Sequence, residues 1–170
     1  MSASSGFHRA PWSRPLVVSS VLATVVCVGI GAGLPMWVEN PGVWWATPLL
    51  LALPPLCALF LVRGYRITPD AILVLRPGWT TRLPRAGLLF AEAAPDAMRG
   101  SIRLCGNGGF FAFTGLFWNR TLGRHRAFVT DPARTVVLRY APRTVVISPA
   151  DPAVFVSELR QSSRKEEVGF

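Results

Sequence analysis

The chain has 170 residues, of which 51% are hydrophobic, and its 18 basic and 9 acidic residues give a formal net charge of +9. The apolar residues gather in the first third, so roughly 105 residues remain for a folded domain, which allows one modest core and excludes two. The sequence pI of about 11.2 raises the question of nucleic-acid binding. However, no predicted helix carries regularly spaced basic residues and the aromatic residues cluster with glycine, so we exclude nucleic acid as a partner.

Two apolar runs without any charged residue dominate the first third of the chain. They cover residues 16–38 and 43–62, and residues 39–42 separate them. About 20 apolar residues, each rising about 1.5 Å in a helix, span a hydrocarbon core of about 30 Å. The pattern therefore predicts two transmembrane helices, joined by a short external loop and preceded by an N-terminal tail over residues 1–15.

The charges that flank the two runs predict the orientation of this hairpin. Arg9 and Arg14 precede it, Arg63 and Arg66 follow it, and the loop contains Glu39 but no basic residue. Cytoplasmic flanks of membrane spans carry the excess of Lys and Arg. We therefore expect a multi-pass protein of the cell membrane with both termini in the cytoplasm.

A second interpretation treats the first run as a cleaved signal peptide, with Arg9 and Arg14 as its basic region. The run is longer than the apolar core of a typical signal peptide, and no clear small-x-small cleavage site ends it. Even after such a cleavage, the second run would keep Arg63 and Arg66 as a cytoplasmic flank.

The chain after the hairpin, residues 63–161, shows short strand patterns with turn signals about every ten residues. Residues 105–115 interrupt these patterns, because glycines alternate there with phenylalanines. Asp151 is a good N-cap, Pro152 suits a first helical position, and the apolar spacing after them predicts a final helix. Residues 162–170 are expected to form a polar tail. The predicted strands are 65–68, 71–75, 79–83, 88–93, 101–104, 115–118, 124–130, 134–140 and 144–148.

Three segments of this region resemble a known family. They are residues 65–72 (YRITPDAI), 121–131 (TLGRHRAFVTD) and 145–149 (VVISP). They are similar to the opening, middle and final strands of the bacterial pleckstrin-homology-like domains found behind transmembrane hairpins. The resemblance implies an α+β membrane protein, in which two transmembrane helices precede an antiparallel β-barrel or sandwich capped by a C-terminal helix. The basic cluster that binds phosphoinositides in eukaryotic relatives is missing, so that activity is not implied.

No residue pattern predicts catalysis, a metal site or a cofactor. His8 lies in the N-terminal tail, and His125 lies between two arginines, where we expect an exposed strand residue. Residues 106–109 lack the Gly-Lys-Ser/Thr of a phosphate loop and precede no predicted helix. The three cysteines match no zinc or redox spacing. We therefore predict that the protein is not an enzyme.

Two groups of residues are candidates for binding. The first group consists of arginines that would face anionic headgroups beneath the bilayer, where each basic side chain contributes about 1 kcal/mol to membrane binding. Alternatively, these arginines belong to an ordinary solvated surface without a binding role. The second group is rich in phenylalanine and has three possible places, namely the core, the membrane interface or the groove of a partner. The candidates are Arg120, Arg124, Arg126, Arg134, Arg139 and Arg143, and Phe110, Phe111 and Phe113.

These features together predict a non-catalytic binding or scaffolding domain at the inner face of a bacterial membrane. Its partners would be the lipid bilayer itself and either anionic lipid headgroups or another membrane protein. The alternative function is that of an accessory subunit of a membrane enzyme or complex.

Overall fold

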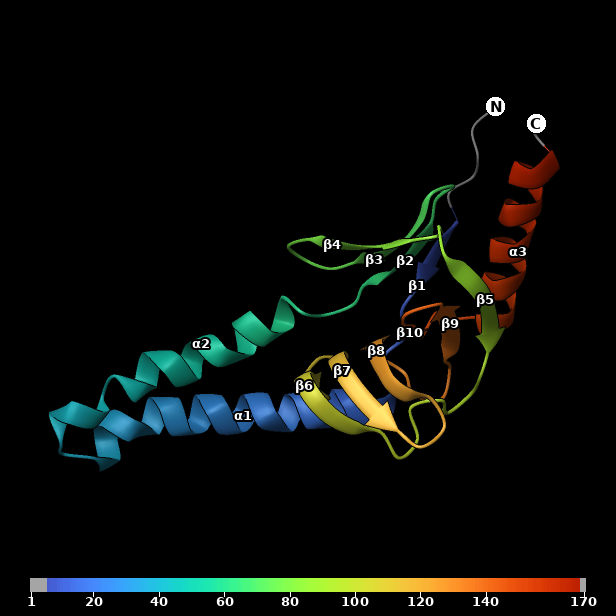
Figure 1. Ribbon diagram of the computed structural model, residues 1–170. Helices are drawn as coiled ribbons and strands as arrows, with labels where there is room; N and C mark the ends of the chain where they lie inside the picture. The colour runs from blue at the N-terminus through green and yellow to red at the C-terminus, as the bar shows by residue number, and fades with distance from the viewer. Residues whose placement is uncertain (1–5, 169–170) are drawn as a thin grey trace.

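The computed structural model describes residues 6–168 as a helical hairpin, two β-sheets and a C-terminal helix (Figure 1). The hairpin extends from one end of the sheets, and the C-terminal helix lies at the opposite end. This arrangement agrees with the predicted mixed α+β class. The elements are β1 (Phe7–Arg9), α1 (Arg14–Trp37), a 3-10 turn (Pro41–Val43), α2 (Ala46–Ala58), β2 (Gly64–Ile67), β3 (Ala71–Leu75), β4 (Thr80–Pro84), β5 (Leu88–Ala93), β6 (Ile102–Gly108), β7 (Phe113–Asn119), β8 (Gly123–Val129), β9 (Val136–Tyr140), β10 (Thr144–Ile147) and α3 (Pro152–Val168).

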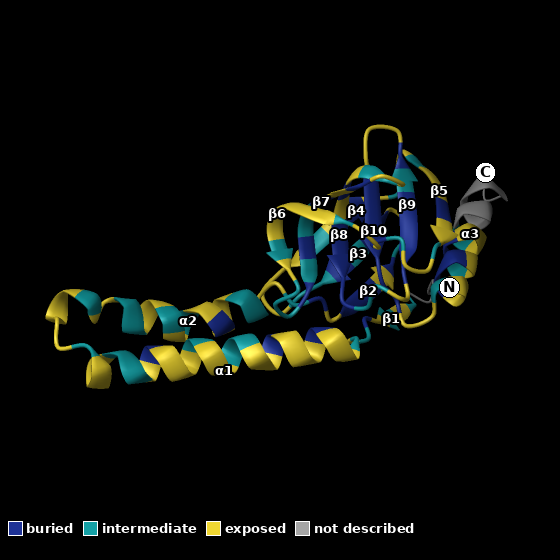
Figure 2. Ribbon diagram, turned by 90° about the horizontal axis from the view of Figure 1, so that it is seen from below, coloured by how far each residue is buried: buried dark blue, intermediate teal, exposed yellow. Residues whose placement is uncertain are grey.

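Helix α1, and α2 together with the 3-10 turn before it, are each long and apolar enough to cross a membrane. Most side chains of α1, and about half of those of α2, are exposed (Figure 2). Ser13 caps α1, because its hydroxyl accepts a hydrogen bond from the Leu16 amide at 3.4 Å. Gly31 lets the two helices approach closely, since a β-carbon there would lie 3.2 Å from side-chain atoms of Leu50 and Leu51.

Helix α2 begins later and ends earlier than the predicted span over residues 43–62. Pro54 and Pro55 lie inside it and remove two amide donors from its last turns. After the helix, the backbone tightens, because the Phe60 amide donates to the Cys57 carbonyl three residues earlier at 3.0 Å. The chain therefore leaves the helix before the apolar run ends and turns toward the sheets.

Part of the predicted N-terminal tail belongs to the folded domain. Strand β1 pairs antiparallel with β2. His8 on this strand lies 2.9 Å from the Glu158 carboxylate and meets the Phe155 ring edge-on at 4.9 Å. Three residues are too few to show the two-residue periodicity of a strand, so the sequence did not predict β1. Residues 1–5 of the predicted tail lie outside the described residues. Cleavage after the first apolar run would remove β1 and α1 from this fold.

The smaller sheet has the strand order β1-β2-β3-β4, and the larger sheet has the order β5-β9-β10-β8-β7-β6. Strands β3 and β5 have the predicted bounds, and the predicted β7–β8 and β9–β10 hairpins are present. The expectation of purely antiparallel pairing is wrong for one pair, because β10 runs parallel to β8. The chain skips one place in the sheet between β8 and β9, and β10 returns into the gap. In the described residues no ladder joins the two sheets, so they form a sandwich and not a closed barrel.

Two elements continue where the sequence predicted an interruption. Strand β6 runs on to Gly108, so the first glycines of residues 105–115 lie in a strand. Gly106 pairs there with Gly115 of β7, and both have positive φ angles. Helix α3 continues to Val168 through most of the predicted polar tail at residues 162–170, of which residues 169–170 lie outside the described residues.

The main core lies between the two sheets and is closed by α3. Tyr65 and Ile72 face it from the smaller sheet, Phe128 and Ile147 from the larger sheet, and Phe155 from α3. We call the side of the larger sheet that meets this core its inner face. A second cluster covers the outer face of the same sheet, around buried Met98, Phe117 and Val129.

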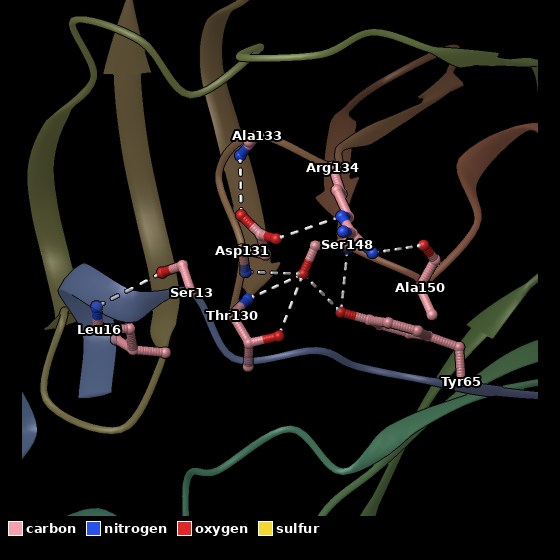
Figure 3. A network of polar contacts seen from close by, with 9 residues as sticks. All are labelled: Ser13, Leu16, Tyr65, Thr130, Asp131, Ala133, Arg134, Ser148 and Ala150. Atoms are coloured by element: carbon pink, nitrogen blue, oxygen red, sulfur yellow. Dashed lines mark hydrogen bonds and ion pairs between the residues drawn. The ribbon is translucent and has the colours of Figure 1, made fainter.

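A buried network of hydrogen bonds joins the two sheets to the start of α1 (Figure 3). The Tyr65 hydroxyl donates to the Phe128 carbonyl at 2.6 Å and accepts from the Ser148 amide at 3.0 Å. The Ser148 hydroxyl accepts from the Thr130 amide at 2.8 Å, and the Thr130 carbonyl accepts from the Ser13 amide at 3.2 Å. The cap of α1 is therefore tied directly to the core of the domain.

This network predicts a loss of stability at alkaline pH. Burial raises the pKa of Tyr65 to about 12, and the hydrogen bonds with Ser148 oppose this only in part. In the unfolded chain the phenol ionises near pH 10. The stabilisation is therefore fully present below pH 10 and is lost as the pH rises through 12, which should lower the free energy of unfolding by about 2 to 3 kcal/mol.

Denaturant unfolding of the full chain in detergent, repeated across this pH range, checks the prediction. The variant Tyr65→Phe should lack most of the alkaline loss. The sequence has 2 tyrosines. Burial also raises the pKa of the other one, Tyr140, so the absorbance of the phenolate should develop late for both. An equal alkaline loss in the wild type and in Tyr65→Phe would contradict the assignment to Tyr65.

Candidate functional site

The predicted phenylalanines lie at the turn between β6 and β7, and this turn is bound to α1. The Ser19 hydroxyl donates to the Gly109 carbonyl at 2.9 Å, and the Phe111 amide donates to the Ser20 hydroxyl at 2.8 Å. The rings of Phe110 and Phe111 stack with their centres 4.7 Å apart. The turn is therefore fixed to the first turns of the helix that leads into the hairpin.

The surroundings of the three rings favour contacts within the chain. The Phe111 ring also meets Trp12 edge-on at 6.2 Å. Phe113 packs against the cluster on the outer face of the larger sheet. All three phenylalanines are partly buried, so the segment serves first as the joint between the domain and α1.

The predicted arginines of β8 and β9 point to opposite faces of the larger sheet. Side chains alternate along a strand, and Phe128 of β8 lies in the main core. Arg124 and Arg126 therefore share the inner face with Phe128. Arg139 lies between the core residues Leu138 and Tyr140 of β9, so it lies on the outer face.

The remaining predicted arginines have separate surroundings. Arg134 is exposed, and its guanidinium lies 3.6 Å from the Asp131 carboxylate, which is largely buried. Arg143 lies over the Tyr140 ring at 5.1 Å. Arg120 is exposed at the β7–β8 turn. The six arginines thus do not form one continuous surface.

An arginine outside the predicted set completes the most unusual arrangement in the structure. The guanidinium groups of Arg76 and Arg126 each lie 5.0 Å from the centre of the Phe128 ring. Arg76 also lies 5.4 Å from the Trp79 ring and 6.0 Å from the Phe60 ring. We call these five residues the arginine–aromatic cluster. It brings together the β3–β4 turn, the inner face of β8 and the chain that follows α2.

Strand alternation explains how this cluster forms. Ile72 and Val74 of β3 lie in the core, and Arg76 continues their side of the sheet beyond the strand. The Arg76 amide donates to the Trp79 carbonyl at 3.1 Å and closes the turn. The Trp79 and Phe60 rings then meet edge-on at 5.2 Å. The alternation of side chains along β3 could therefore have predicted that Arg76 faces the core side of the sheet. Its contact with Phe60 depends on the tertiary fold.

The charge of the cluster is not balanced by any acidic group in the part of the chain that the structure describes. No carboxylate there contacts Arg76 or Arg126, and the Arg76 Nε is buried without a hydrogen-bond partner. Burial, and then the positive charge of Arg126, lower the pKa of Arg76, while Tyr65 acts in the opposite direction. An arginine stays protonated in proteins, so the cluster carries two positive charges around the Phe128 ring.

The larger sheet and the first part of α3 correspond to a known family. Residues 90–163 match the family model of the Bacterial PH domain. Residues 90–163 therefore correspond to a bacterial PH domain. This match confirms the family resemblance of the middle and final motifs, residues 121–131 and 145–149, whereas the opening motif at residues 65–72 lies outside the matched segment. No curated protein or solved structure matches the chain. The PH-family segment contains Arg126 and Phe128 of the cluster, whereas Arg76, Trp79 and Phe60 precede it.

His125 of the PH domain is buried, and the prediction of an exposed strand residue is wrong. It lies on the outer face of β8, where its ring stacks on Phe117 with the centres 6.3 Å apart. Its Nδ1 lies 2.9 Å from the Gly123 carbonyl oxygen, and its Nε2 lies 3.5 Å from the Ser101 hydroxyl. Burial lowers the pKa of His125, and the contact with Gly123 opposes this. The surroundings are those of a neutral histidine in a core.

No group of three or more His, Cys, Asp or Glu side chains gathers at a metal-binding distance within the described residues. The chemistry that the described site offers is therefore that of the arginine–aromatic cluster. Its guanidinium groups donate hydrogen bonds and carry positive charge, which suits recognition of an anion.

Proposed function

We propose that this protein is a non-catalytic, membrane-anchored binding domain that recognises anionic lipid headgroups at the cytoplasmic face of the bacterial cell membrane. The observation that carries the proposal is the place of the arginine–aromatic cluster at the end of α2. Phe60 follows this helix closely, and a β-carbon on Gly78 of the β3–β4 turn would touch the Leu59 side chain at 4.0 Å. With α2 across the bilayer, the cluster lies at the level of the headgroups, where tryptophan and arginine are favourable.

The distribution of charge along the chain supports the cytoplasmic orientation. Arg63 and Arg66 follow α2, and Arg9 and Arg14 precede or begin α1. The opposite end of the hairpin carries Glu39 and no basic residue. Because β1 and the other strands belong to one domain, both ends of the hairpin lie on the same side of the membrane in this proposal.

An exposed apolar edge of the domain lies on the same side as the hairpin. In Figures 1 and 2, β6 is the strand of the larger sheet nearest to the extended part of the hairpin. Ile102 and Leu104 of this strand are 60% and 51% exposed. An exposed apolar edge beside basic and aromatic residues is typical of a surface that rests on a bilayer.

Amide hydrogen exchange of the full chain in nanodiscs tests this function. We expect the β3–β4 turn and β6 to exchange more slowly in phosphatidylcholine discs that contain phosphatidylglycerol than in discs of phosphatidylcholine alone. Salt should reduce the difference, because it screens the attraction between exposed charges. Helix α3, at the far end of the domain, is the internal control. Equal exchange of the turn and β6 in both kinds of disc would contradict the proposal.

A second candidate function is the binding of another membrane protein, as an adaptor or accessory subunit. It is favoured by β6, which forms an unpaired edge of the larger sheet. Such an edge can accept a strand from a partner. A stoichiometric protein that copurifies in mild detergent, and that protects β6 from exchange whatever the lipid charge, would favour this candidate over lipid recognition.

A further inference from the structure

We infer that the arginine–aromatic cluster is a binding site for a single phosphate group, held between the guanidinium groups of Arg76 and Arg126. This inference rests on the proposed function and specifies its ligand. The shared chemistry is a phosphate ester, which either a lipid headgroup or a soluble phosphate ester supplies.

Among the described residues, the side-chain contacts of the two guanidinium groups are with aromatic rings, and neither group forms an ion pair. Arg76 lies over the faces of Phe60, Trp79 and Phe128, and Arg126 lies over Phe128. A guanidinium that stacks on a ring presents its N–H donors in its own plane, away from the stacked face. This geometry suits bidentate hydrogen bonds to two oxygens of one phosphate.

A bound acceptor would complete the surroundings of the buried Arg76 donor. The Arg76 Nε has almost no contact with solvent and no hydrogen-bond partner among the described residues. Buried polar groups are nearly always hydrogen-bonded, because an unmade bond costs stability. An oxygen of a bound phosphate would satisfy this donor.

The repulsion between the two arginines points to the same ligand. Arg126 and burial both disfavour the charged form of Arg76. Arginine does not relieve such a conflict by losing its proton. A negative group between the two side chains relieves it, and Arg126, which is exposed, leaves the cluster open to a ligand from outside.

The residues around the cluster favour a phosphate with an apolar chain attached. Leu59 and Phe60 at the end of α2 are 39% and 44% exposed, and Trp79 is 40% exposed. These side chains form an apolar border between the two arginines and α2. A headgroup phosphate at the arginines would thus place its acyl chains along the helix.

Native mass spectrometry of the full chain in mild detergent tests the site. The probes are phosphatidylglycerol, phosphatidylcholine and glycerol 3-phosphate. We expect one phosphatidylglycerol to bind about tenfold more tightly than phosphatidylcholine, because choline brings a positive charge beside the two arginines whereas the phosphatidylglycerol headgroup has a net negative charge. Glycerol 3-phosphate should compete with phosphatidylglycerol.

Three arginine variants and a matched control assign the binding to the cluster. Arg76→Gln and Arg126→Gln should each weaken phosphatidylglycerol binding about tenfold or more. Arg76→Lys should also weaken it, because lysine keeps the charge but lacks the planar fork. Arg143→Gln, which removes an arginine stacked on Tyr140 outside the cluster, should leave binding unchanged. If thermal unfolding shows that Arg76→Gln does not fold, the test relies on Arg126→Gln, because Arg126 is exposed.

The outcomes separate the site from the proposed function. Binding of phosphatidylglycerol by Arg126→Gln as tightly as by the wild type would overturn the site, even where nanodiscs show a preference for anionic lipid. Binding of glycerol 3-phosphate that both variants abolish, without a preference between the two lipids, would support a phosphate site and contradict lipid recognition. Equal binding of all three probes by every variant would overturn both.

Discussion

Replacing Gly115 by alanine is expected to destabilise the domain by about 3 kcal/mol or more, through backbone strain and steric overlap between two paired strands. Gly115 of β7 pairs with Gly106 of β6. A β-carbon at Gly115 would overlap the Cys105 carbonyl oxygen and would lie 2.8 Å from the Gly106 α-carbon, both of them backbone atoms. Its φ of 140° is also unfavourable for any residue with a side chain. The strands must move apart, and the turn bound to α1 should move with them.

The control for this substitution is Gly87→Ala. Gly87 has a φ of 82°, but a β-carbon there would have no heavy atom within 4 Å. Only the conformational cost of a left-handed residue remains, about 1 to 2 kcal/mol. Denaturant unfolding in detergent compares the two variants, and hydrogen exchange of β6 locates the damage. A Gly115→Ala variant that is no less stable than Gly87→Ala would show that the two strands are not packed this closely.

The elements that the sequence predicted well have strong local signals. The hairpin follows from two long runs without a charged residue, because bilayer thickness sets the required length. Strand β3 lies between Pro69-Asp70 and Pro77-Gly78, and these turn residues set its bounds. The β9–β10 hairpin was equally visible, because a proline-containing turn separates two runs rich in valine.

The features that the sequence did not predict depend on contacts between distant residues. Strand β1 exists because it pairs with β2, and His8 is held by Glu158 at the other end of the chain. Nothing in the sequence of either strand predicts that β10 runs parallel to β8. The glycines of β6 suggested a break, but Gly106 is tolerated in the strand because another glycine lies opposite.

The candidate site was only partly predictable for the same reason. Arg124 and Arg126 belonged to the predicted set, and strand alternation places both on the inner face. Arg76 belonged to a predicted turn, and the sequence did not indicate that it lies near Arg126. Its contact with the Phe128 ring, which Arg126 shares, requires the packing of two sheets. Its contact with Phe60 requires the early end of α2.

Replacing Phe155 by alanine is the second substitution with a large expected effect, a loss of about 3 to 5 kcal/mol in the free energy of unfolding. Phe155 is fully buried in the main core, and its ring meets His8 edge-on at 4.9 Å and Tyr65 at 6.3 Å. The substitution removes most of a large apolar side chain from the contact between α3 and both sheets, and it leaves a cavity. Because β1 is held from α3 through His8, we also expect its amides to lose protection from hydrogen exchange.

The neighbouring residue supplies the matched control, because Val154 lies on the same helix and is 50% exposed. Val154→Ala removes little buried surface, so its cost should stay within about 0.5 kcal/mol. Denaturant unfolding in detergent and hydrogen exchange of β1 measure both effects. Should Phe155→Ala and Val154→Ala destabilise the domain equally, α3 would not be anchored through this ring. The expected difference would show that α3 anchors the core at the end of the domain opposite the hairpin (Figure 1).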